Sequence, residues 1–97
     1  MLIAIPLDDN KEIISELMAT SWAVVDFDNG SIQSTKFYNT KADIDAPFLD
    51  FVVLANKFEN YMEFMNEGSM VLVVREEKSV EDIIEAFKFK ELDEVGI

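Results

Sequence analysis

The chain has 97 residues, of which 20 are acidic and eight are basic, so its formal net charge is −12, and it contains neither His nor Cys. These absences exclude disulfides, thiolate nucleophiles, Cys/His zinc sites and imidazole bases built from this chain. The charge also argues against nucleic-acid binding, because eight scattered cations cannot form a phosphate-neutralising surface.

Hydrophobic residues make up 49% of the chain, so we expect it to fold, as one domain over residues 1–97. The apolar start, residues 1–5, lacks a basic region and meets Pro6 and two aspartates, unlike a signal peptide. No apolar run approaches the roughly 18 residues of a membrane span. We therefore expect a soluble, cytoplasmic protein with no membrane partner.

Three continuous apolar runs, at residues 2–5, 51–55 and 70–74, predict strands that are covered on both faces. Such strands should lie side by side and parallel at the centre of a sheet. The first run should be followed by a short helix over residues 11–18, where apolar residues recur at helical spacing.

A β-hairpin is predicted over residues 22–37, because Asn29-Gly30 stands between two β-prone runs. A type I′ turn needs positive φ at both central positions, and Asn-Gly provides it. A two-residue turn would pair Phe27 with Ile32 and Val25 with Ser34. This hairpin should flank the first strand.

The second helix is predicted over residues 57–67. Asn56 and Glu59 have the spacing of a capping box, and Gly68 provides the stop. Its apolar stripe would consist of Phe58, Tyr61, Met62 and Met65.

A final helix should begin after Ser79 as its N-cap. The buried stripe of this helix would be Val80, Ile83, Ile84 and Phe87, with Leu92 further on. The tail, residues 93–97, should fray. The order of the elements therefore predicts a single α/β domain.

Three strings in this order carry a family resemblance: M-L-I-A-I-P at 1–6, V-V-D and an N-G turn within 24–30, and K-S-V-E-D-I-I-E-A-F at 78–87. Together they resemble the dinitrogenase iron–molybdenum cofactor biosynthesis family. The resemblance implies a ribonuclease-H-like fold with a mixed five-stranded sheet, order 3-2-1-4-5, and helices on both faces. It also implies a non-catalytic carrier or accessory role that involves an iron–molybdenum or iron–sulfur cluster.

The chain departs from the family where that ligand would bind. The family loop S-x-H-F-G-x-A corresponds here to Ser15, Glu16, Leu17, Met18 and Ala19, so leucine replaces the histidine and alanine replaces a glycine. Leucine cannot ligate a metal. The family's glycine-rich turn after the fourth strand is replaced by Asn56 and Lys57. The residues themselves therefore indicate no cofactor, no metal ligand and no catalytic group.

The resemblance also implies a helix between the third and fourth strands, but residues 38–49 show no helical periodicity. An extended crossover of this length can still span the sheet, and it would leave part of one face uncovered over strands 1 to 3. Four aromatic residues around this region could belong to the core or form a surface for a homodimer or protein partner: Trp22, Phe37, Tyr38 and Phe48.

No nucleophile–base pair is visible, and the aspartates lie at turns and strand ends rather than on the central strands. An enzyme is therefore not expected. Two interpretations stay open: an accessory or binding protein of the family's type with a degenerate ligand loop, or an interaction or dimerisation domain that binds no metallocluster.

Overall fold

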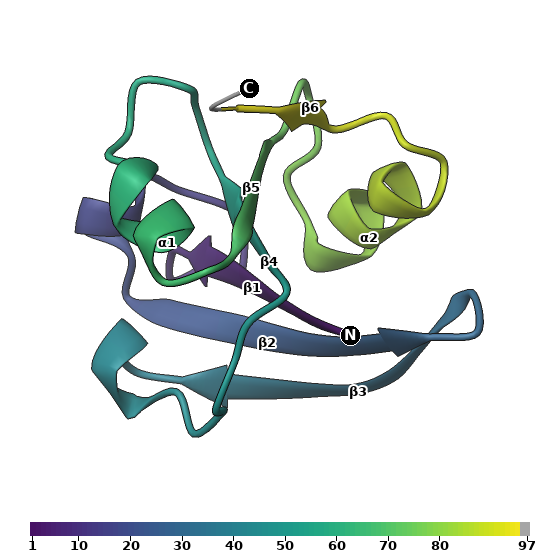
Figure 1. The fold of residues 1–97 in the computed structure, drawn as a ribbon, viewed down its shortest axis with the longest axis horizontal. Coiled ribbons are helices and arrows are strands. Elements are labelled where there is room, and N and C mark those ends of the chain that lie inside the picture. The colour runs from purple at the N-terminus through teal and green to yellow at the C-terminus, as the bar shows by residue number, and fades with distance from the viewer. Residues whose placement is uncertain (96–97) are drawn as a thin grey trace.

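Six strands form one mixed sheet in the order β3-β2-β1-β4-β5-β6 (Figure 1). The computed structural model describes residues 1–95. Its strands are β1 (Leu2–Leu7), β2 (Ser21–Asp28), β3 (Ser31–Tyr38), β4 (Phe51–Leu54), β5 (Met70–Val73) and β6 (Asp93–Glu94). The helices are α1 (Met62–Asn66) and α2 (Val80–Lys88), with single 3-10 turns η1 (Glu16–Met18) and η2 (Lys41–Asp43).

The central strands confirm the predicted arrangement. β1 pairs with β4 and β4 with β5 in parallel, while β2 flanks β1 in the antiparallel direction. The predicted order 3-2-1-4-5 is found, but β6 adds a sixth strand antiparallel to β5. The fraying predicted for the tail is therefore wrong at Asp93 and Glu94, whose backbones pair with β5; residues 96–97 lie outside the described residues.

The Asn29-Gly30 hairpin is confirmed, since φ is 52° at Asn29 and 79° at Gly30. Phe27 pairs with Ile32 as predicted. A register shift between Asp26 and Phe27 then places Val25 opposite Thr35 rather than Ser34. A bulge inserts an extra residue into one strand, so the pairing predicted from the turn alone fails beyond it.

Two hydrophobic cores cover the two faces of the sheet. On one face, Ile3, Ile5 and Val25 pack with the buried stripe of α2, which confirms Val80, Ile83 and Ile84 as its inward residues. The Ser79 hydroxyl caps this helix by accepting a hydrogen bond from the Asp82 amide, at 3.1 Å. The other face packs against α1 and the crossover between β3 and β4.

Trp22 lies in this second core. Its side chain is 3% exposed and packs against Phe64, with the two ring centroids 6.2 Å apart. Of the two alternatives for Trp22, the core is therefore correct and the interaction surface is wrong, because side-chain alternation along β2 places Trp22 on the face that α1 and the crossover cover.

The crossover over residues 39–50 contains no helix beyond the single turn η2. Ile44 and Leu49 nevertheless pack against the core that contains Ala4, Trp22 and Val24. The face expected to be uncovered over strands 1 to 3 is thus partly covered, because apolar side chains of an extended segment replace those of a helix.

The predicted helix over residues 11–18 is wrong. The Asp8 side chain accepts hydrogen bonds from the Asn10 and Glu12 amides, and Lys11 takes a φ of 61°. The chain then turns back, and the Ile13 amide donates to the Lys78 carbonyl at 2.8 Å. These contacts use the backbone groups that a helix would need.

The predicted helix over residues 57–67 is shortened to α1. Phe64 is its buried aromatic residue, at 1% exposure, whereas Phe58 is 87% exposed. The predicted inward stripe was therefore wrong at Phe58 and Met62, although Tyr61 and Met65 do pack against the core. Gly68 ends the helix with a φ of 93°, as predicted. Among residues 1–95, neither helix has the length and apolar character that a bilayer span requires.

Candidate functional site

A cleft of about 470 Å³ lies between the loop before β2 and the turn after β4. β1 and β4 are parallel neighbours, so the segments that follow them start from the same edge of the sheet. In open α/β sheets, ligands bind outside these carboxyl ends. The cleft is lined by Ser15, Glu16, Leu17, Asn56, Phe58, Glu59, Asn60 and Glu63.

The structure thus brings together the two segments that the sequence singled out. Ser15, Glu16 and Leu17 of the loop face Asn56 of the turn across the cleft, whereas Met18, Ala19 and Lys57 are not part of its lining. These segments are about 40 positions apart in the chain, so only the parallel pairing of β1 with β4 makes them neighbours.

Glu59 fastens the two segments to each other. Its Oε1 accepts a hydrogen bond from the Glu16 amide at 2.7 Å. Its Oε2 accepts from the Ala55 amide at 2.9 Å and from the Asn56 amide at 3.0 Å. The carboxylate therefore holds the floor of the cleft through three backbone N–H groups.

This role of Glu59 is not evident from the sequence. Its signal was the capping-box spacing from Asn56, and the expected contact with the Asn56 amide is indeed present. However, no helix begins there: the Asn56 side chain accepts from the Phe58 amide at 2.9 Å, which forms a tight turn instead. The third contact, with Glu16, depends on tertiary structure alone.

The cleft is acidic. Burial raises the pKa of Glu16 above its ordinary value, and the nearby charges of Glu63 and then Glu59 raise it further, while Lys41 opposes the rise. Like charges disfavour the ionised form of a carboxyl. The net rise in the pKa of Glu16 therefore indicates that burial and the neighbouring acids outweigh the attraction of Lys41.

Lys41 is the cation whose charge acts on Glu16, and it already forms ion pairs with two other acids. Its Nζ donates to Glu67 at 2.9 Å and to Glu63 at 3.0 Å, and it lies 4.4 Å from the centroid of the Phe64 ring. Burial alone would lower the pKa of Lys41, but the hydrogen bonds with Glu67 and Glu63 outweigh it and raise the pKa.

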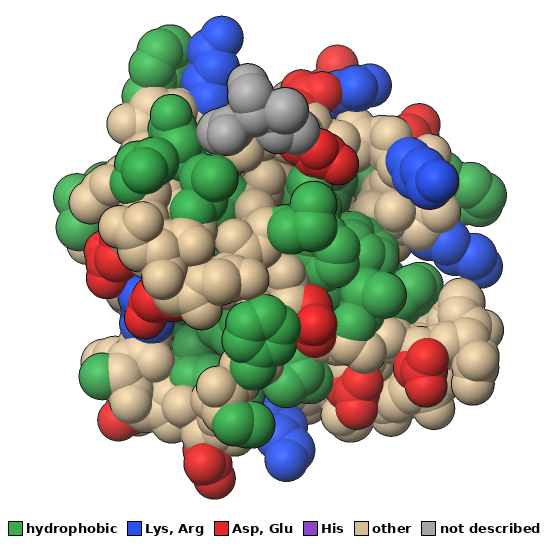
Figure 2. All heavy atoms as spheres, in the orientation of Figure 1, with side chains coloured by type: hydrophobic (Ala, Val, Ile, Leu, Met, Phe, Trp, Pro, Cys, Tyr) green, Lys and Arg blue, Asp and Glu red, His purple; other side chains and the backbone are tan. Residues whose placement is uncertain are grey.

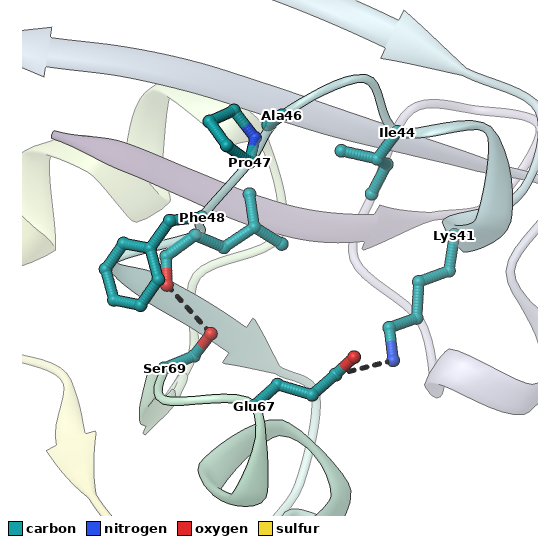
Figure 3. A pocket seen from close by; sticks show the side chains of 8 residues that line it. Lys41, Ile44, Ala46, Pro47, Phe48, Glu67 and Ser69 are labelled. Carbon is teal, nitrogen blue, oxygen red and sulfur yellow. Dashed lines mark hydrogen bonds and ion pairs between the residues drawn. The ribbon is translucent and has the colours of Figure 1, made fainter.

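A second hollow, of about 260 Å³, lies beside Lys41 under the crossover (Figure 3). Figure 3 shows Lys41 pointing toward Glu67, while the Ser69 hydroxyl donates to the Leu49 carbonyl at 2.8 Å. These bonds join the crossover to the end of α1 and the start of β5. We interpret this hollow as part of the support for α1, because its polar groups are bonded to one another.

The rim of the acidic cleft is apolar and exposed. Leu17 is 90% exposed and Phe58 is 87% exposed, and both line the cleft. Met18, beside Leu17, is 68% exposed. Large apolar side chains grouped on a surface mark interaction sites more often than isolated ones do.

The cluster that the resemblance implies does not fit this cleft. Iron–sulfur clusters are held mainly by thiolates, with imidazole as the alternative, and the chain contains neither Cys nor His. Leu17 occupies the expected histidine position, and both oxygens of Glu59 already accept backbone hydrogen bonds. Within residues 1–95, no three Asp or Glu side chains are arranged to hold a metal ion.

The structure separates the remaining residues of the predicted interaction surface. Phe37 pairs with Ala23, so it lies on the α2 face, whereas Tyr38 packs with the core on the α1 face. Phe48 lies near Gly68, where β5 begins, far along the strands from Tyr38. Phe37 and Phe48 are each about half exposed, at 53% and 50%.

Several solved structures have the same fold. A crystal structure from Methanocaldococcus jannaschii, of a protein provisionally described as a dinitrogenase, superposes with a TM-score of 0.82 at 22% identity, over 99% of this chain and 95% of that one. An NMR structure under the same provisional description gives 0.81 at 23% identity, over 100% and 94%. A Thermotoga protein provisionally described as a NifB protein of the DUF35 family gives 0.69 at 19% identity, over 97% and 92%.

No protein-family model matches the chain, and no curated protein matches it. At these identities the structural likeness establishes the fold, a small α/β domain with a mixed sheet. It covers nearly the whole of the chain and of each neighbour.

Proposed function

We propose that this chain is a non-catalytic accessory protein of the type found in nitrogenase cofactor assembly, and that its cleft binds a protein partner rather than a metallocluster. The provisional descriptions of its structural neighbours support the first part. The ribonuclease-H-like fold implied by the sequence resemblance, and the degenerate ligand loop at residues 15–19, belong to the same proposal.

One observation carries the second part. The cleft has the position of a ligand site at the carboxyl ends of β1 and β4, but Leu17 and Phe58 project from its rim almost fully exposed. Exposed leucine and phenylalanine gain by burial, about 1.5–3 kcal/mol for each side chain that is fully buried. A metallocluster would not bury them in this way, whereas a partner's side chains would.

The charge of the cleft selects the chemistry of the partner. Glu16, Glu59 and Glu63 line it, and the pKa of Glu16 is already raised by burial and by its two acidic neighbours. A Lys or Arg side chain would relieve this repulsion. We therefore infer that the partner presents an apolar residue flanked by basic ones.

Anaerobic reconstitution with iron, sulfide and molybdate tests the exclusion of a cluster. We expect no cluster absorbance and no metal on the protein after desalting. Stoichiometric metal that stays bound, and that is lost in Glu59→Ala, would overturn the exclusion and restore the carrier interpretation.

A peptide titration tests the partner chemistry. A short peptide of alternating Leu and Lys, added to the 15N-labelled protein, should shift the amide signals of residues 15–19 and 55–60. Leu17→Ser and Phe58→Ser should each weaken binding by roughly ten-fold, the loss typical of an interface anchor. Phe89→Ser is the matched control, because Phe89 is a large apolar residue that is likewise exposed, at 62%, but lies at the end of α2 and not in the cleft.

If the peptide shifts no signals, or if Phe89→Ser weakens it as much as the cleft variants do, the cleft is not the docking site. A second candidate would then remain. β3 is an edge strand of eight residues with Ile32 and Phe37 exposed, which favours self-association by strand pairing.

A further inference from the structure

A larger cavity, of about 530 Å³, lies on the opposite face of the sheet from α1, between the sheet and the end of α2. Six apolar side chains form most of its lining: Phe27, Phe51, Met70, Leu72, Phe87 and Leu92. Figure 2 shows this region as a hydrophobic area between α2 and the strands, with basic side chains on its α2 side. It is separate from the acidic cleft and shares no residue with it.

The walls of this cavity are aromatic and mutually packed. The Phe87 ring lies edge-on to Phe51 at 4.9 Å and to Phe27 at 5.5 Å, measured between ring centroids. The mutual packing of the Phe27, Phe51 and Phe87 rings holds the walls of the cavity in place. Small-molecule sites are concave, of about 300–1,000 Å³, mostly apolar and aromatic, with a few placed polar groups, and this cavity meets each of these criteria.

Three charged residues line the cavity: Lys88, Lys90 and Glu94. Lys88 is the last residue of α2, and Lys90 follows two residues later; both line the cavity. In a chain with eight basic residues against 20 acidic ones, a cavity lined by two lysines and one acid has a local excess of positive charge. Within the described part of the chain, neither ammonium group forms an ion pair with a carboxylate.

The backbone holds Lys90 at this mouth in an unfavourable conformation. Its φ is 58°, its amide donates to the Phe87 carbonyl at 3.1 Å, and the Glu91 amide donates to the Ala86 carbonyl at 2.8 Å. This is the helix-ending arrangement in which glycine is usual, because a side chain with positive φ is strained. Stability alone therefore favours glycine at position 90.

We propose that this cavity binds a small amphiphilic carboxylate, with its apolar body against the Phe27, Phe51 and Phe87 rings and its anionic head between Lys88 and Lys90. Glu94 lines the cavity from β6, so the head group is directed to the α2 side by attraction to the lysines and repulsion from this acid. The net charge of −12 opposes the approach of any anion, and the two lysines provide the local exception.

Three probes that share one alkyl chain test this proposal: decanoate, decanol and decyltrimethylammonium, each below its micellar concentration. Titrated into the 15N-labelled protein, decanoate should shift the amides of residues 70–72 and 86–92 in a saturable way. Its dissociation constant should be lower than that of decanol, and decyltrimethylammonium should bind most weakly. Equal affinities for all three, or decanoate shifts confined to other residues, would overturn the proposal.

Variants distinguish binding from structural roles. Lys88→Gln and Lys90→Gly should each weaken the binding of decanoate by roughly two- to five-fold, the range for a solvent-exposed ion pair. The affinity for decanol should stay unchanged. Lys90→Gly should at the same time raise the melting temperature, because it relieves the positive φ. Glu94→Gln should strengthen decanoate binding.

Lys36→Gln is the matched control for charge. Lys36 pairs with Val24 and so lies on the α1 face, away from the cavity. If it weakens decanoate as much as Lys88→Gln does, only the net charge matters and the site is not built as proposed. A second copy of the chain covering this face would instead appear as concentration-dependent shifts without ligand, and that result would also overturn the proposal.

Discussion

Single carboxylates decide the shape of the acidic cleft, because each accepts backbone hydrogen bonds that would otherwise form local structure. Asp8 turns the chain before η1, and Glu59 joins the loop of Glu16 to the turn after β4. Hydrogen bonds to charged groups contribute about 1.5–3 kcal/mol, more than bonds between neutral groups. Replacing such a carboxylate should therefore affect the cleft more than replacing the apolar residues on its rim.

Glu59→Ala should lower the free energy of unfolding by about 1–3 kcal/mol, since it leaves two partly buried amides and one exposed amide without their acceptor. Urea denaturation measures the loss, and hydrogen exchange at the Glu16 amide should accelerate. Glu63→Ala is the control: this acid pairs with Lys41 at the surface and should change stability by no more than about 0.5 kcal/mol. Equal urea midpoints for the two variants would contradict the role of Glu59.

Glu16 should impose a pH dependence on stability. Its pKa in the folded protein is raised above 4.5, so the folded state holds the proton to a higher pH than the unfolded chain does. The protonated Glu16 side chain thus contributes to the free energy of unfolding below its ordinary pKa. This contribution is lost as the pH rises through the raised pKa. Glu16→Gln should remove this loss.

The melting temperature of Glu16→Gln should therefore rise relative to that of the natural chain as the pH increases from the ordinary pKa of 4.5 through the raised value, and the two should converge below that range. Glu81→Gln removes the same charge from an exposed position at the start of α2 and controls for net charge. A melting difference that stays constant with pH would show that Glu16 does not titrate within this window.

Among the secondary structure elements, α1 shows that the local pattern of apolar residues predicts a helix but not its start or its buried face. Residues 58–65 have helical spacing of apolar side chains, and a helix over 57–67 would direct Phe58 inward. Instead α1 begins at Met62 and directs Phe64 against Trp22. Glu59 accepts hydrogen bonds from the Glu16, Ala55 and Asn56 amides, so the helix does not begin at residue 57. A different set of side chains, with Phe64 in place of Phe58, therefore faces the sheet.

The two phenylalanines provide a direct test of this register. Phe64→Ala should cost about 3–5 kcal/mol of unfolding free energy, because it empties a fully buried position. Phe58→Ala should change it by no more than about 0.5 kcal/mol, because that ring is exposed. Thermal and urea unfolding would measure both. Comparable losses would mean that the helix extends over residues 57–67 after all.

At the scale of the whole molecule, a net charge of −12 is carried on a compact domain. Its radius of gyration is 11.9 Å, close to the roughly 12.5 Å of a folded chain of this length. Such a charge repels a second copy at low ionic strength and is screened within about 10 Å at 0.1 M salt. The exposed edge of β3 offers the backbone groups through which copies could pair.

Self-association through β3 should therefore increase with salt. Sedimentation equilibrium should detect monomer at low ionic strength and a growing dimer fraction toward about 0.5 M sodium chloride, where the charges are screened. Phe37→Lys should keep the protein monomeric, because a charged edge residue blocks strand pairing. Phe89→Lys, which adds the same charge at the end of α2 rather than on the edge strand, should not. A monomer at every salt concentration would remove the dimerisation candidate.

Much of the fold could be predicted because its signals are local. The three apolar runs determine the parallel centre of the sheet, Asn29-Gly30 the hairpin, and Ser79 with its following stripe the helix α2. In each case the residues of one short segment indicate the type of element, although the backbone groups of the parallel strands pair with distant strands. The segments corresponding to the family's ligand loop and turn could also be located, at residues 15–19 and 56–57.

Tertiary structure decided the rest, because distant groups compete for the same backbone hydrogen bonds and the same buried space. Hydrogen bonds to Asp8 and Lys78 prevent the helix predicted over residues 11–18. Trp22 is buried against Phe64, and the Glu16 amide is bonded to the Glu59 carboxylate. The tertiary structure also placed two lysines beside an aromatic cavity that no local pattern indicates. The absence of His and Cys was determined by the sequence alone; that the corresponding site is an acidic cleft with an exposed apolar rim was determined by the fold.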